Sequence, residues 1–442
     1  MNMDLEHELK QAGVLINTCF QTHFSEMSEI DSATDLEGFL TEKLISNGTS
    51  SQKHYLENFI RVLSALLKGK QSAEVFQFYV EAQFFMERKD AQQLLNQITH
   101  LNAFNEGSLN QRITFPDTDK TPKVNVIITT YNRERYLEQV IDSILQQDYP
   151  NIELIVIDDN SKDGTHSLME RKYADAANVI YMRNDKNEGP GTNRLKAFVT
   201  HGDGEYILFL DDDDYLINTN YISRAVAFHE KNPQVSFVAA NVFMEKTGAS
   251  ELALSDLKLS NVVKKYDYFI NFEKKGYPKP ASTLTTVFKR KALIEMDILN
   301  MEMVNDSAIY LRSLLVGDAG FIDTIAGVYR IHGNNITFNL KSDFIIENLR
   351  EKLMIKNMAV NRFNYDAKAV EAWFGSSVYV TIMYYLKYSA KTKSDYNAMF
   401  TWTKENCPAI YNKLKYDAMK FFVMRGLSRL RIFGRSAIAQ KS

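Results

Sequence analysis

The sequence has few cysteines, little net charge and no long apolar run. Only two of its 442 residues are cysteines, Cys19 and Cys407. They lie far apart and suit neither a disulfide framework nor a thiolate metal cluster, which favours a reducing cytoplasm. Because the formal net charge is −3 and the isoelectric point is near 6.3, the whole-protein charge gives no case for nucleic-acid binding.

Sequence signals for membrane insertion are also missing. The first residues, MNMDLEHELKQAG, lack the basic and apolar regions of a secretory signal. No apolar run approaches the length of about 18 residues that a membrane-spanning helix needs. We therefore expect a cytoplasmic protein. With 45% hydrophobic and 12% aromatic residues, the chain can bury a substantial core, divided among a few domains.

The sequence divides into three regions. Residues 1–115 are expected to form an N-terminal helical domain, because apolar side chains recur at helical spacing over 51–67 and 72–86. Two prolines in a polar stretch, Pro116 and Pro122, then stop helix propagation. A second domain is expected over 116–340, and residues 341–442 return to helices rich in aromatic residues.

The second domain begins with a strand, a helix and a strand. An apolar run at 124–129 predicts a strand, the spacing over 134–147 predicts a helix, and residues 152–157 predict another strand. This order predicts a right-handed βαβ unit and hence a parallel sheet. Further elements are expected at 179–182, 206–210 and 236–239 (strands) and at 192–199 (a helix). The predicted fold class is α/β.

Polar segments follow four of the predicted strands, at the sheet edge where open parallel sheets bind ligands. They are TTYNR at 129–133, DDNSKDGT at 158–165, NEGPGTNR at 187–194 and DDDD at 211–214. If these segments converge, they form a polar pocket with an aromatic ring, a basic group and a metal site. Such a pocket suits a nucleoside diphosphate.

The fourth segment, Asp211 to Asp214, directly follows the apolar run YILFL. Carboxylates a few ångströms apart repel each other and raise each other's pKa. A hard divalent ion such as Mg²⁺ or Mn²⁺ would compensate them and keep open positions for phosphate oxygens. The alternative is a solvated acidic turn that caps the next helix. The three neighbouring polar segments favour the metal site.

In their order and spacing, TTYNR, LIVIDDNSKDGT, NEGPGTNR and YILFLDDDD resemble the family 2 glycosyltransferases. The resemblance covers residues 123–336. It implies the GT-A nucleotide-diphospho-sugar transferase fold, with a Rossmann-like, mostly parallel sheet, flanked here by N-terminal and C-terminal helical regions. It also implies an inverting, metal-dependent enzyme that moves a sugar from a UDP-sugar to a glycan or lipid-linked glycan acceptor in bacterial surface polysaccharide or glycoconjugate synthesis.

The resemblance assigns the nucleoside to the first two segments. Thr130 and Tyr131 would flank a uracil, with Asn132 in the same loop. Asp158 or Asp159 would accept the imide proton of the base, and Asp159 is favoured because strand alternation points the two side chains in different directions. The alternative role for Asp158 is a structural bond to nearby backbone amides.

The resemblance assigns the diphosphate and the metal to the later segments. Arg194 would bind phosphate or brace the pocket, because a guanidinium suits that oxyanion geometry; the alternative is a surface salt bridge. Asp213 is expected to coordinate Mn²⁺ or Mg²⁺, with Asp211 near the ribose or a metal-bound water and Asp212 assisting. His332, in YRIHGNNI, is a further candidate metal ligand, unless it only makes a structural hydrogen bond.

An inverting transfer needs a base that removes the acceptor hydroxyl proton. The segment VNDSAIYLR at 304–312 resembles the family's E-D motif, but Asn305 replaces the usual acidic residue. Asp306 is the expected base, its alternative role being a helix N-cap, and Glu302 is the second candidate. Because of Asn305, a sugar-nucleotide binding module without turnover stays an alternative. A nucleotidyltransferase of related fold is disfavoured because TTYNR lacks a glycine-rich basic signature.

The end of the sequence is basic. Residues 409–442 contain eight lysines and arginines against one acidic residue, Asp417. Apolar side chains interleave with the basic ones over 413–435, which predicts an amphipathic segment that lies on an anionic membrane surface. The alternative is a helix packed on the protein with a solvated basic face. The expected location is therefore cytoplasmic, with peripheral binding to the inner face of the cell membrane as an option, and association into an oligomer is left open.

Overall fold

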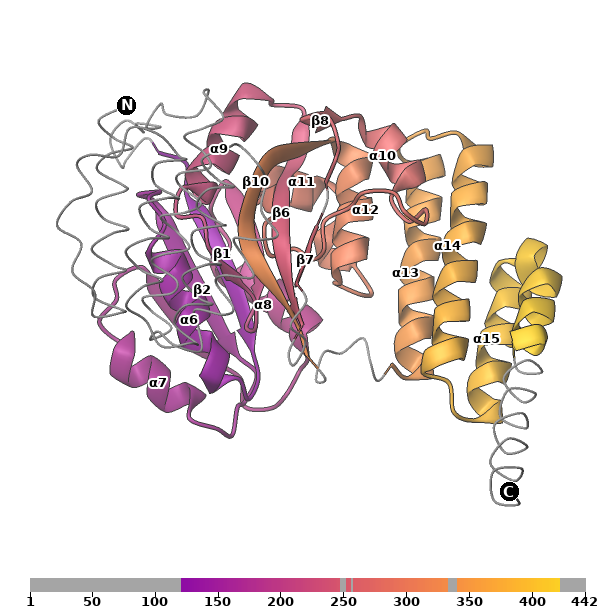
Figure 1. Ribbon diagram of the computed structural model, residues 1–442, viewed down its shortest axis with the longest axis horizontal. Coiled ribbons are helices and arrows are strands. Elements are labelled where there is room, and N and C mark those ends of the chain that lie inside the picture. Colours follow the sequence, from indigo (N-terminus) through magenta and orange to yellow (C-terminus); the bar gives the residue numbers. More distant parts are fainter. Residues whose placement is uncertain (1–120, 247–251, 256, 333–339, 422–442) are drawn as a thin grey trace, which may run out of the picture. The chain divides into compact units, whose positions relative to one another are not determined.

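The computed structural model describes residues 121–246, 252–255, 257–332 and 340–421 (Figure 1). The expected N-terminal helical domain and the part of the basic segment beyond residue 421 lie outside these residues. The described chain forms two compact units that interleave along the sequence. The first contains residues 121–262, 280–290 and 320–331, and the second contains residues 263–279, 291–319 and 332–421.

The first unit is built on a sheet with the strand order β3-β2-β1-β4-β9-β6-β10-β5. The first four strands of this order run parallel: β1 (Val124–Thr130), β2 (Ile152–Asp158), β3 (Val179–Arg183) and β4 (Tyr206–Asp211). They coincide with the strands that apolar runs predict at 124–129, 152–157, 179–182 and 206–210. The predicted α/β fold with a parallel βαβ start is confirmed.

The other strands extend the sheet with antiparallel pairs. They are β5 (Tyr215–Leu216), β6 (Val235–Lys246), β7 (Leu252–Leu254), β8 (Val262–Val263), β9 (Val287–Lys289) and β10 (Asp318–Ile331). Strand β9 lies antiparallel between β4 and β6, and β5 is antiparallel to β10. Strand β6 is longer than the predicted 236–239, because β7 pairs antiparallel with its second half.

The sheet of the first unit has helices on both faces. Alternate residues of β1, including Val124 and Val126, share a core with Leu137 of α6 (Glu134–Leu145) and with buried residues of α7 (Thr165–Lys172) and α9 (Tyr221–Lys231). Helix α8 (Pro190–His201) instead packs on β1 and β2, where buried Ile127 points the other way.

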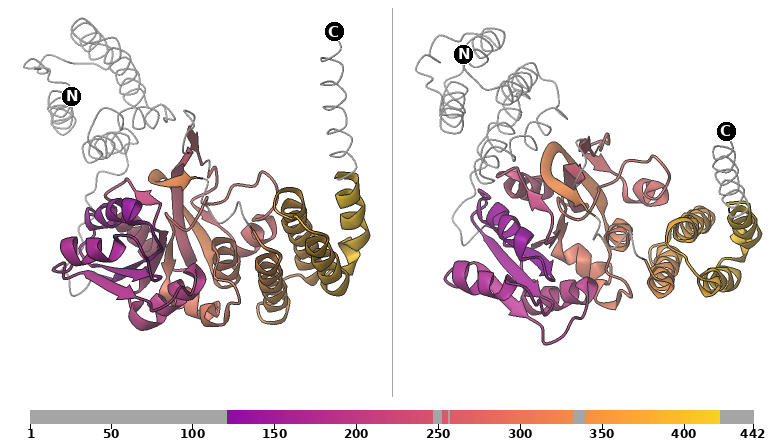
Figure 2. Two further views of the ribbon diagram at one scale, coloured as in Figure 1. Left: turned by 90° about the horizontal axis from the view of Figure 1, so that it is seen from below. Right: turned by 60° about the horizontal axis from the view of Figure 1, so that its bottom comes forward.

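The second unit is helical, as expected for the C-terminal region. It comprises α10 (Lys265–Asn271), α11 (Arg290–Glu295), α12 (Asp306–Val316), α13 (Ser342–Asn361), α14 (Ala367–Tyr388) and α15 (Lys393–Asn406), followed by a helix over 408–421. Helices α13, α14 and α15 pack side by side (Figure 2). Within the described residues, no helix combines the length and apolarity that crossing a membrane would require.

Candidate functional site

The polar segments that follow the parallel strands meet at one edge of the sheet, as predicted. Thr130 at the end of β1 is in register with Asp158 at the end of β2, and Thr129 is in register with Asp211 at the end of β4. Because parallel strands end at the same edge, each following segment starts beside the next. Hydrogen bonds and ion pairs then join the segments.

The first segment is joined to the fourth, Asp211 to Asp214, which is called the aspartate tetrad from here on. The backbone N–H of Tyr131 donates to Oδ2 of Asp212 at 3.2 Å, and Nη1 of Arg133 lies 3.7 Å from Oδ2 of Asp213. Thr130 is buried, whereas the Tyr131 side chain is 45% exposed. An exposed ring at this position is available to a ligand from solvent.

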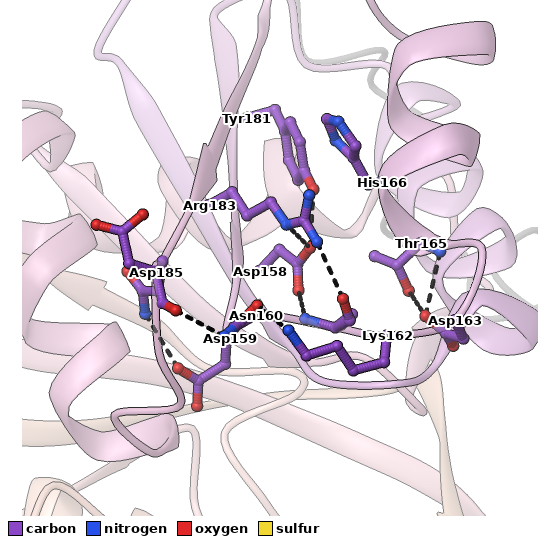
Figure 3. A network of polar contacts seen from close by, with 12 residues as sticks. Asp158, Asp159, Asn160, Lys162, Asp163, Thr165, His166, Tyr181, Arg183 and Asp185 are labelled. Carbon is purple, nitrogen blue, oxygen red and sulfur yellow. Dashed lines mark hydrogen bonds and ion pairs between the residues drawn. The ribbon is translucent and has the colours of Figure 1, made fainter.

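The second segment is shaped around Asp158, which is fully buried (Figure 3). Its Oδ1 accepts from the N–H of Ser161 at 2.8 Å, and its Oδ2 accepts from the Tyr181 hydroxyl at 2.8 Å. Nε of Arg183 lies 3.5 Å from the same Oδ2. These are the contacts expected of the structural alternative, in which Asp158 shapes the loop through backbone amides.

The first and second segments are tied to each other through Asn132. Its N–H donates to the hydroxyl oxygen of Ser161 at 2.8 Å, and its Oδ1 accepts from the N–H of Lys162 at 2.7 Å. Asn132 and Asn160 both adopt positive φ, +54° and +65°, which asparagine tolerates better than most residues. These hydrogen bonds therefore hold the first and second segments against each other.

Asp159 joins the second segment to the third. Its Oδ1 accepts from Nδ2 of Asn184 at 3.0 Å and from the N–H of Glu188 at 2.8 Å, and its Oδ2 accepts from the N–H of Gly189 at 2.9 Å. Burial opposes ionisation of this carboxyl group, but hydrogen bonds from Asn193 and from these donors hold its pKa below the ordinary value. Asp159 is therefore a carboxylate at neutral pH.

The tetrad places its first carboxylate against Arg194 of α8. Nη2 of Arg194 lies 2.6 Å from Oδ1 of Asp211, whose side chain is 36% exposed. The two following aspartates are each only 8% exposed. Burial, together with the negative charge of Asp213, raises the pKa of Asp212 to about 8. Arg194, whose side chain is 6% exposed, thus lies within the cluster, and its salt bridge is not the surface salt bridge expected as the alternative.

Arg330 is a residue of the site to which no role was assigned from the sequence. Its N–H donates to Oδ1 of Asp214 at 2.9 Å, and its Nη1 donates to the backbone carbonyl of Asp213 at 2.8 Å. Burial and the charges of Asp213 and Asp211 raise the pKa of Asp214 well above its ordinary value. The signal for it in the sequence was the YRIHGNNI segment, in which only His332 was given a role.

The carboxylate oxygens of the turn suit a hard divalent ion whose remaining coordination positions would be filled by a bound ligand. Among the described residues, no three or more His, Cys, Asp or Glu side chains form a cage. The turn instead offers Asp211, partly exposed, and Asp213, whose side chain is 12% exposed. Mg²⁺ is typically held by one or two carboxylates with water and phosphate oxygens. A cation here would also offset the repulsion that raises the pKa of Asp212 and Asp214.

Asp306 and His332 belong to the second unit, so their parts in the site stay predictions. Asn305 is the N-cap of α12, because its side chain accepts from the N–H of Ala308 at 2.9 Å. The N-cap alternative for Asp306 is therefore wrong: Asp306 is the first residue of the helix and is half-buried. A capping role also gives a physical reason for an asparagine at position 305.

Comparison with known proteins finds similarity to glycosyltransferases over part of the chain. Residues 125–297 match the family described as "Glycosyl transferase family 2". A GalNAc(5)-diNAcBac-PP-undecaprenol beta-1,3-glucosyltransferase of Campylobacter jejuni is 30% identical over 213 residues, which cover 48% of this chain and 65% of that protein. The poly(ribitol-phosphate) beta-N-acetylglucosaminyltransferase TarS of Staphylococcus aureus is 37% identical over 113 residues, which cover 25% of this chain and 19% of TarS.

A solved structure supports the fold. The crystal structure of S. aureus TarS 1–349 in complex with UDP-GlcNAc superposes with a TM-score of 0.51 at 18% identity, covering 66% of this chain and 82% of that chain. At this identity the likeness concerns the fold alone. The present chain spans less than two thirds of the length of the two relatives named above.

Proposed function

We propose that the chain, whose residues 125–297 match the family 2 glycosyltransferases, transfers a sugar, with inversion, from a UDP-sugar to a glycan or lipid-linked glycan. The observation that carries the proposal is that polar segments from separate strands are bonded together at one sheet edge, with Tyr131 joined to Asp212 and Arg194 joined to Asp211. The UDP-GlcNAc bound to TarS and the undecaprenol-linked acceptor in the name of the Campylobacter relative support this donor and acceptor.

The nucleoside is assigned to the joined first and second segments. The exposed Tyr131 ring, beside Thr130, is suited to pack on uracil. Asp159 has a depressed pKa and hence an ionised carboxylate, which can accept the imide N–H of the base. Asp158 and Asn132 hold the loops through contacts with backbone amides, so in this proposal they position the nucleoside pocket.

The diphosphate is assigned to Arg194 and the tetrad. Asp213 and Asp211 would hold Mn²⁺ or Mg²⁺, with His332 as a further proposed ligand. When bound, the ion supplies Lewis-acid stabilisation of the departing diphosphate. Arg194 adds a fixed positive charge beside Asp211, which favours the same developing anion. Asp212 assists from its bond to Tyr131.

Asp306 is assigned the proton transfer. As the acceptor hydroxyl oxygen forms its bond to the anomeric carbon, the bond from that carbon to the diphosphate oxygen breaks, and UDP leaves as an anion. The hydroxyl proton passes to the Asp306 carboxylate. This side chain lies in the first turn of α12.

The cellular setting is proposed from the acceptor and from the basic segment. A lipid-linked acceptor for surface polysaccharide or glycoconjugate synthesis would be reached at the inner face of the membrane. Within 413–435, the described part carries exposed Lys413, Lys415 and Lys420 on the helix over 408–421. We propose that these lysines attract anionic lipid. Nucleic acid is not a proposed partner.

A donor screen tests the proposal. UDP-, GDP- and dTDP-sugars are incubated with the protein, with Mn²⁺ or with a chelator, and the released nucleotide is measured. We expect release from at least one UDP-sugar, and loss of that release with the chelator. Release from a GDP- or dTDP-sugar alone would overturn the donor assignment, and release from no sugar nucleotide would favour the binding module. Asn305 no longer favours that module, because it caps α12.

A further inference from the structure

Arg330, near the end of β10, carries a buried positive charge. Its relative exposure is 3%, and its guanidinium carbon lies 4.4 Å from the ring centre of Tyr215 and 5.2 Å from that of Tyr136. A charge removed from water in this way is retained only where aromatic faces and hydrogen-bond acceptors compensate it. The contacts of Arg330 therefore indicate what the side chain does.

Those contacts connect the aspartate turn to the body of the first unit. Nε of Arg330 lies 3.3 Å from Oε2 of Glu245 in β6, and Nη2 donates to the side-chain oxygen of Gln139 in α6. Nη1 donates to the backbone carbonyl of Asp213 at 2.8 Å, and the Arg330 N–H donates to the carboxylate of Asp214 at 2.9 Å. One arginine thus links two framework elements to consecutive residues of the turn.

The turn has other contacts besides those of Arg330, and the Ser282 hydroxyl donates to Oδ2 of Asp214 at 3.5 Å. The N–H of Asp214 reaches the carbonyl of Asp211 at 3.3 Å, while the buried carboxylates of the turn repel one another, which favours opening toward water. The Arg330 guanidinium donates to the main chain of Asp213. It can therefore hold the backbone of Asp213 while the carboxylate remains the group that faces a cation.

We propose that Arg330 is a positioning residue that holds the backbone of Asp213 and Asp214, so that the Asp213 carboxylate is presented to the metal–diphosphate group of the donor. This inference rests on the proposed function. Replacing a residue that orients a metal ligand, without itself binding the metal, typically lowers metal affinity by about 10- to 100-fold. The loss of Arg330 should therefore change Mn²⁺ binding beyond any general loss of stability.

The test measures Mn²⁺ binding to the full chain in the presence of saturating UDP, by isothermal titration calorimetry, which needs no turnover. The variants are Arg330→Met, which removes the charge, and Arg330→Lys, which keeps the charge but lacks the planar guanidinium with its several N–H donors. Unfolding temperatures are recorded for each. We expect the apparent Kd for Mn²⁺ to rise at least about tenfold in Arg330→Met and by less in Arg330→Lys.

Arg290→Met is the matched control. Nε of Arg290 also donates to a backbone carbonyl, that of Gly202, and its guanidinium lies 5.6 Å from the ring centre of Phe198. Gly202 precedes β4, whereas the tetrad begins at the last residue of β4. This variant should lose a similar kind of contact and keep its Mn²⁺ affinity within about twofold, since additive effects are expected for distant sites.

The outcomes separate the inference from the proposed function. If the wild type binds no Mn²⁺ with UDP, the proposed metal-dependent function fails. If the wild type binds but folded Arg330→Met and Arg330→Lys bind equally well, the positioning role is refuted. It is also refuted if Arg290→Met weakens Mn²⁺ binding as much as Arg330→Met at the same loss of unfolding temperature. Should Arg330→Met not fold, Arg330→Lys decides.

Discussion

Binding of a divalent cation at the tetrad should release a proton from Asp212. Burial and the charge of Asp213 raise the pKa of Asp212 to about 8, so about 90% of this carboxyl group is protonated at pH 7 and about 10% at pH 9. A nearby cation favours the ionised form. Asp212 should therefore contribute a release of about 0.9 proton per bound ion at pH 7 and about 0.1 at pH 9.

Calorimetry measures this release directly. Mn²⁺ is titrated into the protein with saturating UDP in two buffers that differ in ionisation enthalpy, and the difference in observed heat gives the number of protons released. Because the pKa of Asp214 is also raised, the wild type can release more than one proton. The decisive quantity is the difference between the wild type and Asp212→Asn, at pH 7 and at pH 9.

Asp203→Asn provides the control. The hydrogen bond from Lys123 holds the pKa of Asp203 below its ordinary value, so this group is ionised at pH 7 and should contribute no proton. Equal proton release by the wild type and Asp212→Asn at pH 7 would refute the reasoning. So would a difference between them that does not fall from pH 7 to pH 9.

The same pKa has a consequence for folding without metal. The folded pKa of Asp212 is raised above the unfolded value, so the folded state keeps a proton that the unfolded state has lost. The free energy of unfolding should therefore fall as pH rises from about 4 toward 8, by up to about 1.4 kcal/mol per pH unit from this group. When unfolding is measured with a chelator present, the free energy of unfolding should fall less with rising pH in Asp212→Asn than in the wild type.

Three further predictions concern the base, a buried histidine and a buried ion pair. Asp306→Asn should lower kcat by about 10²- to 10⁴-fold and keep UDP affinity; unchanged turnover would remove Asp306 from the mechanism. Burial lowers the pKa of His229 to about 3, while its Nε2 bonds the Val287 carbonyl. Its stabilising contribution is present above pH 6.5 and is lost as pH falls, by about 2 kcal/mol at pH 5. In denaturant titrations at pH 5 and at a pH above 6.5, His229→Gln should not show this loss of stability. An equal loss in the wild type and in His229→Gln would contradict the prediction. Glu351→Ala leaves buried Arg312 without its carboxylate partner and should cost about 3–5 kcal/mol in chemical denaturation, whereas a cost under about 1 kcal/mol would show that the pair is not needed.

Much of the α/β unit could be predicted from local sequence patterns. The apolar runs at 124–129, 152–157 and 206–210 are long enough and apolar enough to be buried strands, and the helical spacing over 134–147 makes the connection a crossover. A parallel arrangement then requires the polar residues after each strand to share one edge. The structure confirms that convergence through the register of Thr130 with Asp158 and of Thr129 with Asp211.

Roles that depend on a distant partner could not be predicted in the same way. Asp158 and Asp159 are neighbours in the sequence, but the first is bonded by Tyr181 and the second by Glu188 and Gly189. Which partner each carboxylate meets depends on how separate loops pack. The nucleotide, metal and base assignments stay predictions for the experiments above.

The sequence by itself determined the elements, their parallel order and the chemical character of the binding edge, because hydrophobic periodicity and polar turn residues act over a few positions. The tertiary structure decided how the acidic turn is held. Arg330 lies more than a hundred residues beyond Asp213, and its guanidinium reaches that carbonyl only because β10 and β5 pair beside the turn. Burial, which sets the pKa of Asp212, likewise exists only in the folded chain.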